Sequence, residues 1–329
     1  MKLATFTAGD SRHRLGAVVD DGETIVDLQA AVQFLSGRPD ASFASLQALI
    51  EGGDDALGRA YDVLDTAPGR ARIRRADVRL QAPLQPPPQI RDCACFEEHF
   101  INAFREARKV RAALFDDPDA AMREMEERQI LFMPKEFYER PLYYKANRFA
   151  VIGTDDDVIW PGYCNTLDFE LEFGCYIKKP AKNVSVTGAR DFIFGYTIFN
   201  DMSARDEQTL EMPGNLGPGK GKDFDTGNPM GPWLVTADEL TDPYALKMEA
   251  RVNGEIWGGG TSASMYWKFE DLIAHISRDE TLYPGEFLGS GTVGTGAGIE
   301  QMRFLKPGDV VELYVEGIGT LKNRVVRPG

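Results

Sequence analysis

The chain has 329 residues, of which 51 are acidic and 37 are lysine or arginine, so its formal net charge at pH 7 is −14. This charge argues against nucleic acid or an anionic membrane as a partner, because both attract basic surfaces. The first residues carry no signal-peptide pattern, no apolar run approaches the length of a membrane span, and the four cysteines lack C-x-x-C spacing. We therefore expect a cytoplasmic protein with reduced thiols, long enough for two domains.

Residues 1–82 are predicted to form a small β-rich N-terminal domain. Short runs of strand character are separated by turn residues, at 2–7, 14–19 and 24–28. Segments with helical spacing follow, at 28–35 and 46–50. Prolines at positions 83, 86, 87 and 88 then predict a stiff linker over 83–89.

A second domain is predicted over residues 90–329. It opens on I-R-D-C-A-C-F-E-E-H, which places Asp92 at the end of a strand and His99 on the next turn or in a first helical turn. A lone histidine is more often structural than catalytic, and this sequence alone leaves both roles open. Residues 103–140 are highly charged and helix-prone. Such a segment is either a solvated helical face or a helical lid inserted over a site.

Acidic and apolar residues alternate over positions 168–173, which is the periodicity of a strand. Phe169, Leu171 and Phe173 should pack inward, while Glu170 and Glu172 project together on the other face. Their Cα atoms would lie roughly 6.6 Å apart, two residues along a strand. Carboxylates held this close repel each other and raise one another's pKa unless a cation lies between them.

A second buried strand is predicted over 192–199, where the sequence is almost uniformly apolar. It ends at Asn200-Asp201, so a third carboxylate would reach the same rim. Three hard oxygen donors suit Mg²⁺, Mn²⁺ or Ca²⁺ better than zinc. The alternative is that these acids only form the solvated face of a sheet.

The remainder of the chain mainly contains patterns that predict loops, a hairpin and a helix, and it has fewer candidate functional residues. Residues 214–230 form a Gly/Pro-rich loop that carries Lys222 but lacks the order of a nucleotide-binding P-loop. Asn253-Gly254 predicts a β-hairpin, and 267–277 has helical periodicity. The glycine-rich run at 289–296 could approach an anion or be an ordinary tight turn.

Several motifs together resemble the fumarylacetoacetate hydrolase family, from about residue 90 to the C-terminus. They are D-C-A-C-F-E-E-H, D-F-E-L-E, N-D-M-S-A-R-D, G-K-D-F-D-T followed by G-P-W, and, more weakly, G-S-G-T at 289–292. The N-terminal unit is similar to the small β domain of longer members. The resemblance implies an α+β, mainly β fold, a mixed β-sandwich roll that holds Mg²⁺, Mn²⁺ or Ca²⁺, usually in a homodimer.

The resemblance also assigns roles to individual residues. The metal-ligand positions are Asp92, Glu170, Glu172 and Asp201. The catalytic positions are His99 as general base, Arg205 as a clamp for a carboxylate or oxyanion, and Lys222 as a stabiliser of developing negative charge. The substrate-binding positions are Tyr144, Lys145, Gln208 and Thr292.

Two departures from the family pattern concern the partner of His99. Acylpyruvase-like members carry a glutamate three residues after the histidine, where this chain has Asn102. Members that cleave fumarylacetoacetate use a glutamate beyond the Gly-Thr loop, and here Glu300 is the acidic residue in that region.

The resemblance predicts metal-dependent hydrolysis of a carbon–carbon bond in a fumarylacetoacetate- or acylpyruvate-like 1,3-diketo acid. Water activated by His99 would attack a carbonyl, and the cation would hold the enolate leaving group. The alternative on the same scaffold is a decarboxylase or isomerase of a 2-oxo acid, which needs no activated water. A non-catalytic cation-binding protein is a further hypothesis, and it would be favoured if His99 lay far from the acids.

Overall fold

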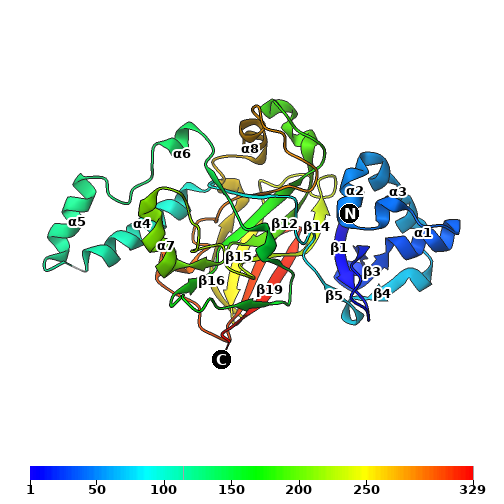
Figure 1. Ribbon diagram of the computed structural model, residues 1–329, viewed down its shortest axis with the longest axis horizontal. Coiled ribbons are helices and arrows are strands. Elements are labelled where there is room, and N and C mark those ends of the chain that lie inside the picture. The colour runs from blue at the N-terminus through cyan, green and yellow to red at the C-terminus, as the bar shows by residue number, and fades with distance from the viewer. Residues whose placement is uncertain (114, 329) are drawn as a thin grey trace.

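A large mixed β-sheet runs through the structure, a computed structural model that describes residues 1–113 and 115–328 (Figure 1). Its strands, in hydrogen-bonded order, are β4 (Arg72–Arg74), β3 (Thr24–Asp27), β2 (Arg14–Val19), β1 (Lys2–Thr7), β14 (Asn228–Thr236), β12 (Ile193–Asn200), β11 (Leu171–Ile177), β17 (Phe287–Gly289), β6 (Ile90–Cys93) and β7 (Tyr143–Lys145). Two short strands join it at the side, β5 (Arg79–Leu80) on β1 and β8 (Val151–Ile152) on β14.

A smaller sheet packs against the middle of the large one. Its strands, in order, are β16 (Glu255–Thr261), β15 (Lys247–Val252), β18 (Val310–Val315), β19 (Gly319–Val326) and β9 (Asp157–Ile159). Phe173 and Tyr196 of the large sheet share one buried core with Met248 and Leu313 of the small sheet and with helix α8 (Phe269–Ile276). Burying each large side chain contributes ~1.5–3 kcal/mol. This core therefore fixes β11 and β12, beside which the acidic residues lie.

The predicted hairpin at Asn253-Gly254 is confirmed. Val252 of β15 pairs with Glu255 of β16, and the two turn residues have φ of 53° and 81°. Both angles are in the left-handed region, which asparagine and glycine adopt with the least steric cost and which matches the twist of the flanking strands.

The N-terminal strands extend the large sheet. β1 pairs with β2 on one side and with β14 on the other, where Leu3 lies opposite Leu234. Helices α1 (Leu28–Ser36), α2 (Leu46–Glu51) and α3 (Gly53–Thr66) cover this part of the sheet (Figure 1). Their core residues form one cluster with Leu234 of β14 and Phe199 of β12. Residues 83–89 contain neither helix nor strand, as the prolines predict.

The acidic stretch at 168–173 is not one continuous strand, and its predicted bounds were wrong. β10 (Leu167–Asp168) pairs with β13 (Ser203–Ala204), whereas β11 begins at Leu171 and pairs with β12 and β17. Glu170 lies between them in an isolated bridge to Ala297. The chain changes partners here, and periodicity cannot reveal such a change. Phe169, Leu171 and Phe173 are buried as predicted.

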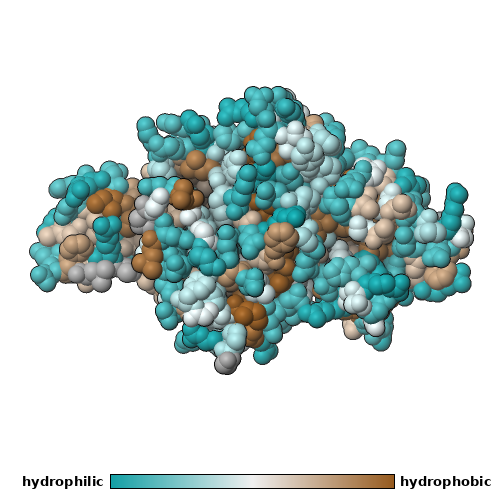
Figure 2. All heavy atoms as spheres, viewed as in Figure 1, coloured by the Kyte–Doolittle hydropathy of each residue, from teal (hydrophilic) through white to brown (hydrophobic). Residues whose placement is uncertain are grey.

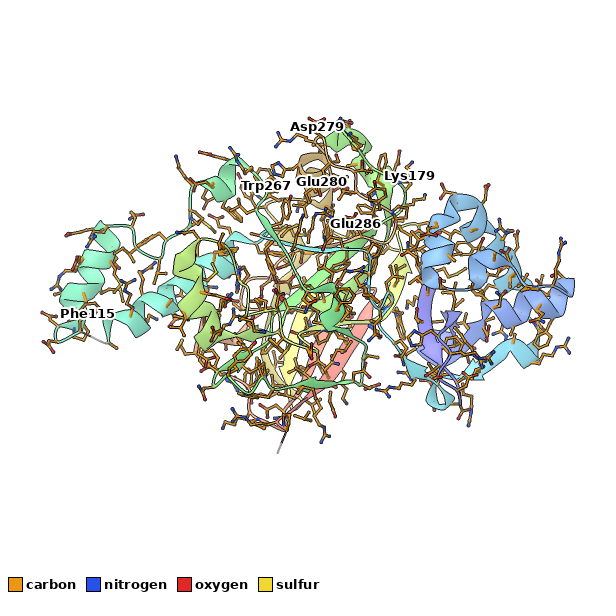
Figure 3. All side chains as sticks on the ribbon, viewed as in Figure 1. Phe115, Lys179, Trp267, Asp279, Glu280 and Glu286 are labelled. Atoms are coloured by element: carbon orange, nitrogen blue, oxygen red, sulfur yellow. The ribbon has the colours of Figure 1, made fainter. Side chains whose placement is uncertain are left out.

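The charged segment after His99 is helical. α4 (Glu97–Ala112) has Glu97 and Glu98 in its first turn and Lys109 and Arg111 in its last, the arrangement that the helix dipole favours. α5 (Pro118–Glu127) packs on α4, and the pair projects away from the sheets, with Phe115 near its far end (Figures 1 and 3). The short α6 (Glu136–Glu139) leads back to the body.

Aromatic contacts hold the start of α4 against the body. Phe100 lies 6.1 Å from Phe137, which in turn lies 5.3 Å from Tyr266 (centroid distances). The indole Nε1 of Trp267, labelled in Figure 3, donates to the backbone carbonyl of Phe137. The face of the molecule in Figure 2 is mostly hydrophilic, with scattered apolar side chains. Among the described helices, none is both long enough and apolar enough to span a membrane.

Candidate metal and catalytic site

Three buried carboxylates converge at one end of the large sheet, where β6 and β12 end and the antiparallel β11 begins, and we call them the acidic pocket. Asp92 lies in β6, Glu172 in β11, and Asp201 directly after β12. One carboxylate oxygen from each lies within 4.8 Å of the other two. The three side chains come from distant parts of the sequence, and the strand order of the large sheet brings them together.

Gly289 of β17 provides the space between Asp92 and Glu172. It pairs with Asp92 on one side and with Gly174 on the other. A Cβ atom at position 289 would lie 2.4 Å from Asp92 Oδ1 and 3.3 Å from Glu172 Oε2. Any side chain there would therefore intrude between the two carboxylates.

The acidic pocket lacks enough positive charge to balance it. Burial and the nearby Asp201 raise the pKa of Asp92 to about 8, and burial with the charge of Asp92 raises the pKa of Glu172 well above its ordinary value. Burial also raises the pKa of Asp201 to about 6 although Lys222 opposes this. Asp92 Oδ1 and Asp201 Oδ1 are buried without a hydrogen-bond partner. Mutual repulsion and unpartnered oxygens fit a divalent cation, which these three residues could hold.

Beside the acidic pocket, two cations neutralise two further acids, and we call this group the ion-paired rim. It consists of Asp168, Glu170, Arg205 and Lys222. Glu170 accepts Lys222 Nζ at 2.7 Å on one oxygen and lies 2.7 Å from Arg205 Nη2 through the other. Burial alone would raise the pKa of Glu170, but Lys222 and Arg205 prevail and lower it well below its ordinary value.

The position of Glu170 bears on its predicted role as a metal ligand. Both of its oxygens face cationic side chains, and it is not part of the acidic pocket. Its backbone N–H donates to Asn200 Oδ1 (3.1 Å), which ties it to the end of β12. Metal ligation by Glu170 therefore stays a prediction, and it would require sharing an oxygen with Lys222 or Arg205.

Arg205 and Lys222 are likewise held by acids. The guanidinium of Arg205 donates to Asp168 Oδ2 (2.9 Å) and to Gln208 Oε1 (2.9 Å). Asp168 is fixed in turn by the backbone N–H groups of Gly298 and Ile299, and burial raises its pKa in spite of Arg205. Lys222 Nζ also bonds Asp201 Oδ2 at 2.6 Å, so the rim and the pocket share one carboxylate.

The imidazole of His99 contacts the carboxylate of Glu300, a residue 201 positions further along the chain. Nδ1 of His99 lies 2.9 Å from Glu300 Oε1, and Nε2 lies 3.9 Å from Glu170 Oε1. Glu300, buried in the short 3₁₀ turn Gly298–Gln301, also accepts from Asn102 Nδ2 at 3.0 Å. The Gly-Thr loop that precedes Glu300 was the available signal, but its register relative to His99 could not be derived without the fold.

The predicted substrate contacts divide into two kinds. Tyr144 donates to Asp201 Oδ2 (2.6 Å), and Thr292 donates to Glu172 Oε1 (3.3 Å), so both touch the acidic pocket. The structure does not bring Lys145 to the pocket. Successive residues of a strand face opposite sides, so Lys145 lies on the side of β7 away from Tyr144, and its side chain is exposed.

The side of β6 opposite Asp92 is fixed by a buried arginine. Arg91 forms ion pairs with Glu286 and Glu280, which lie near each other in Figure 3. The four cysteines are buried and free, in agreement with the reduced thiols predicted.

Comparison with known proteins shows which family this chain resembles. Residues 115–326 match the model of the fumarylacetoacetate (FAA) hydrolase C-terminal region. Oxaloacetate tautomerase fahd2, mitochondrial, of Xenopus laevis is 32% identical over 332 residues, which cover 99% of this chain and 90% of that protein. Oxaloacetate tautomerase YisK of Bacillus subtilis is 30% identical, with 97% of this chain and 99% of that protein covered. The human oxaloacetate tautomerase FAHD2A is 39% identical over 59% of this chain and 60% of its own length.

Solved structures share the fold. A fumarylacetoacetate hydrolase from Exiguobacterium antarcticum has a TM-score of 0.72 at 24% identity, with full coverage of both chains. Maleylpyruvate hydrolase from Sphingobium sp. SYK-6 has a TM-score of 0.71 at 23% identity. These structural matches confirm the predicted sheet-rich fold, and the sequence matches go further: the chain belongs to the fumarylacetoacetate hydrolase family.

Proposed function

We propose that this protein is a metal-dependent tautomerase that interconverts the keto and enol forms of oxaloacetate or a closely similar 2-oxo dicarboxylic acid. The contact between His99 Nδ1 and Glu300 Oε1 (2.9 Å) carries the proposal. It directs a proton acceptor, Nε2, to within 3.9 Å of Glu170 at the edge of the acidic pocket. Two relatives that align over nearly the whole chain are named oxaloacetate tautomerases, which supports this reaction above the others.

The reaction moves one proton and breaks no carbon–carbon bond. Nε2 of His99 takes a proton from the carbon next to the keto group, and the electron pair of that C–H bond becomes the C=C bond of the enolate. Nε2 of His99 then gives this proton to the enolate oxygen, which yields the enol and returns the imidazole to its neutral form. Glu300 stabilises the positive charge on the imidazole while it holds the proton. The reverse sequence returns the proton to carbon.

The other residues of the site stabilise the negative charges of the substrate and of the enolate. Asp92, Glu172 and Asp201 would hold a divalent cation, which would supply positive charge to balance the negative charge that develops on the substrate. The ammonium of Lys222 lies at the same edge and can donate a hydrogen bond to the enolate oxygen. Arg205 and Gln208 are bonded to each other, and we assign them to the second carboxylate of the substrate.

Hydrolysis of a carbon–carbon bond in a fumarylacetoacetate- or acylpyruvate-like 1,3-diketo acid is the second candidate. The same His99–Glu300 contact favours it, because an oriented base can also deprotonate water. Decarboxylation of a 2-oxo acid would use the same stabilised enolate. A non-catalytic cation-binding role has less support, because His99 lies beside the acids.

The test follows the ultraviolet absorbance of enol oxaloacetate in the presence of metal-stripped protein given Mg²⁺ or Mn²⁺. We expect metal-dependent loss of the enol signal with no CO₂ released. His99→Ala should lower the rate by ~10²–10⁴, while His275→Ala, on the distant helix α8, should not. Pyruvate from an acylpyruvate would favour hydrolysis instead, and CO₂ from oxaloacetate would favour decarboxylation. A wild-type rate in His99→Ala would refute the role of His99.

A cytoplasmic setting and a homodimer remain proposals. The sequence resemblance implies the homodimer, whereas the four free cysteines favour the reducing cytoplasmic setting. Light scattering of the purified protein at several concentrations measures the assembly directly, and a mass equal to one chain would contradict the dimer.

A further inference from the structure

We propose that Asn102 is a positioning residue that holds Glu300 in register with His99 and thereby fixes the tautomer of the histidine ring. The inference deepens the proposed function, because it concerns how the assigned base is kept ready. It rests on contacts around Glu300 that no sequence signal assigned to Asn102.

α4 presents both side chains to the same carboxylate. Asn102 follows His99 by three positions, so the two lie one turn apart on one face of the helix. His99 Nδ1 lies 2.9 Å from Glu300 Oε1, while Asn102 Nδ2 donates to Glu300 Oε2 at 3.0 Å. Each oxygen of one carboxylate is thus bonded to its own residue of α4.

Backbone donors complete the environment of Glu300. The N–H of Thr295 donates to Oε2 at 2.7 Å, and the N–H of Ala297 donates to Oε1 at 3.2 Å. With Asn102, three donors surround a buried carboxylate, which is the environment of an acceptor-only, ionised group. Nδ1 of His99 must then carry a hydrogen and donate it, and Nε2 keeps its lone pair toward the pocket.

Asn102 further restrains the rotation of the Glu300 carboxylate. The last torsion of a glutamate side chain has a broad energy profile, so the two backbone donors alone restrain the rotation of the carboxylate less than the three donors do together. The Asn102 amide bonds Oε2 from the side of α4, which keeps Oε1 aimed at Nδ1. Without it, rotation of the carboxylate weakens the contact to Nδ1 and frees the ring to exchange tautomers.

The amide group matters, because an acid at this position would act in the opposite sense. Asn102→Asp would place a second carboxylate about 3 Å from Glu300 Oε2 in place of the donor at 3.0 Å. The two groups would repel each other and force Glu300 away. The proposal therefore orders the variants: wild type has the best-fixed ring, Asn102→Ala a looser one, and Asn102→Asp the most disturbed one.

Imidazole ¹⁵N NMR of the full-length, metal-free protein tests the proposal without using activity. The chain has 3 histidines, His13, His99 and His275, so His99→Ala assigns the signal of interest. We expect the Nδ1–H tautomer for His99 in the wild type and a mixture of tautomers in Asn102→Ala. Asn183→Ala is the matched control, because the Asn183 amide also donates to a carboxylate, that of Asp279, on the surface.

Turnover of the metal-loaded variants provides the second readout. Loss of orientation should lower kcat ~10- to 100-fold in Asn102→Ala with KM little changed, and Asn102→Ser, which keeps a donor, should recover part of it. Far-ultraviolet circular dichroism checks folding, and Asn102→Leu, which has a similar size but no donor, replaces Asn102→Ala if the latter fails to fold. A pure Nδ1–H signal in a folded Asn102→Ala overturns the proposal. A tautomer change with no turnover of oxaloacetate in the wild type would instead leave Asn102's role standing and refute the proposed function.

Discussion

The acidic pocket and the ion-paired rim lie side by side, yet their charges are handled in opposite ways. In the rim, Glu170 is paired with Arg205 and Lys222, and its pKa is lowered. In the pocket, Asp92 and Glu172 face each other without a cation, and their pKa values are raised. Burial is similar for all of them. The difference therefore comes from charge partners, and it separates acids that the protein neutralises itself from acids that need a cation from solution.

Asp201 connects the two groups. One of its oxygens bonds Lys222 and Tyr144, and the other has no partner. A change in the rim should consequently be felt in the pocket. The following predictions test this division.

Lys222→Met should have the largest effect on the metal-free protein. It would leave Glu170 and Asp201 without their ammonium, and breaking a buried ion pair costs ~3–5 kcal/mol. Urea unfolding in the presence of EDTA measures this loss. Lys220→Met, at an exposed lysine in the same loop, should change stability by less than ~0.5 kcal/mol. A loss below about 1 kcal/mol for Lys222→Met would show that the rim is not charge-compensated by this residue.

Glu172→Gln, in the acidic pocket, should raise the stability of the metal-free protein, whereas Lys222→Met lowers it. Without metal the variant should be more stable than the wild type, because the repulsion between Glu172 and Asp92 is relieved. It should also lose the stabilisation by Mg²⁺, which amounts to ~2.7 kcal/mol at a metal concentration 100 times Kd. Thermal unfolding with and without metal shows both effects, with Glu124→Gln on exposed α5 as the control. Equal stabilisation of variant and wild type by metal would contradict the site.

Gly289→Ala tests the space in the pocket. The added Cβ would lie 2.4 Å from Asp92 Oδ1, so Asp92 must move. We expect metal affinity to fall ~10- to 100-fold, as it does when the surroundings of a metal ligand are disturbed. Calorimetric titration with Mn²⁺ gives the affinity, and Gly214→Ala, where a Cβ would meet nothing within 4 Å, is the control. Unchanged affinity would mean that the cation does not need Asp92.

The metal-free protein should become less stable as the pH rises, because the pKa of Asp92 is raised in the folded state. The pKa of Asp92, about 8 in the folded protein, exceeds its unfolded value of ~3.9, so its contribution to stability is full below pH ~4 and is lost as pH rises through 8. Between pH 7 and 8 we expect a loss of about 1 kcal/mol, and a flatter profile in Asp92→Asn. Added Mg²⁺ should offset the loss, because it takes the place of the bound protons. Rising stability over this interval in EDTA would refute the raised pKa.

Sequence patterns revealed the acids but not their pairing. Alternation around Glu170 and Glu172 predicted two carboxylates on one face, and the apolar run before Asp201 predicted a third nearby. Which acids remain unpaired depends on Lys222, 52 positions from Glu170, and on the strand order that places Asp92 beside Glu172. Local periodicity contains no information on such contacts.

Glu300 was named from the sequence as the acidic residue beyond the Gly-Thr loop, but its contact with His99 could not be derived, for the same reason. Glu300 lies 201 positions away, and its contact depends on the turn that follows the Gly-Thr loop. In contrast, the Asn253-Gly254 hairpin was predictable because its partners are adjacent in sequence. The helix α3 escaped prediction, although Ala56, Ala60 and Val63 form a buried face, because small residues give a weak apolar signal.

Because β1 pairs with β14, the protein should not be separable into two independent fragments at the proline-rich segment. The proline-rich segment invites a cut between an N-terminal and a catalytic fragment. Such a cut would strip β14 of its neighbour and leave backbone N–H and C=O groups along an apolar strand open to other chains. The catalytic fragment would then be prone to self-association through that edge. The N-terminal unit thus acts as a protective cover for the sheet that carries Asp201, in addition to any part it has in binding substrate.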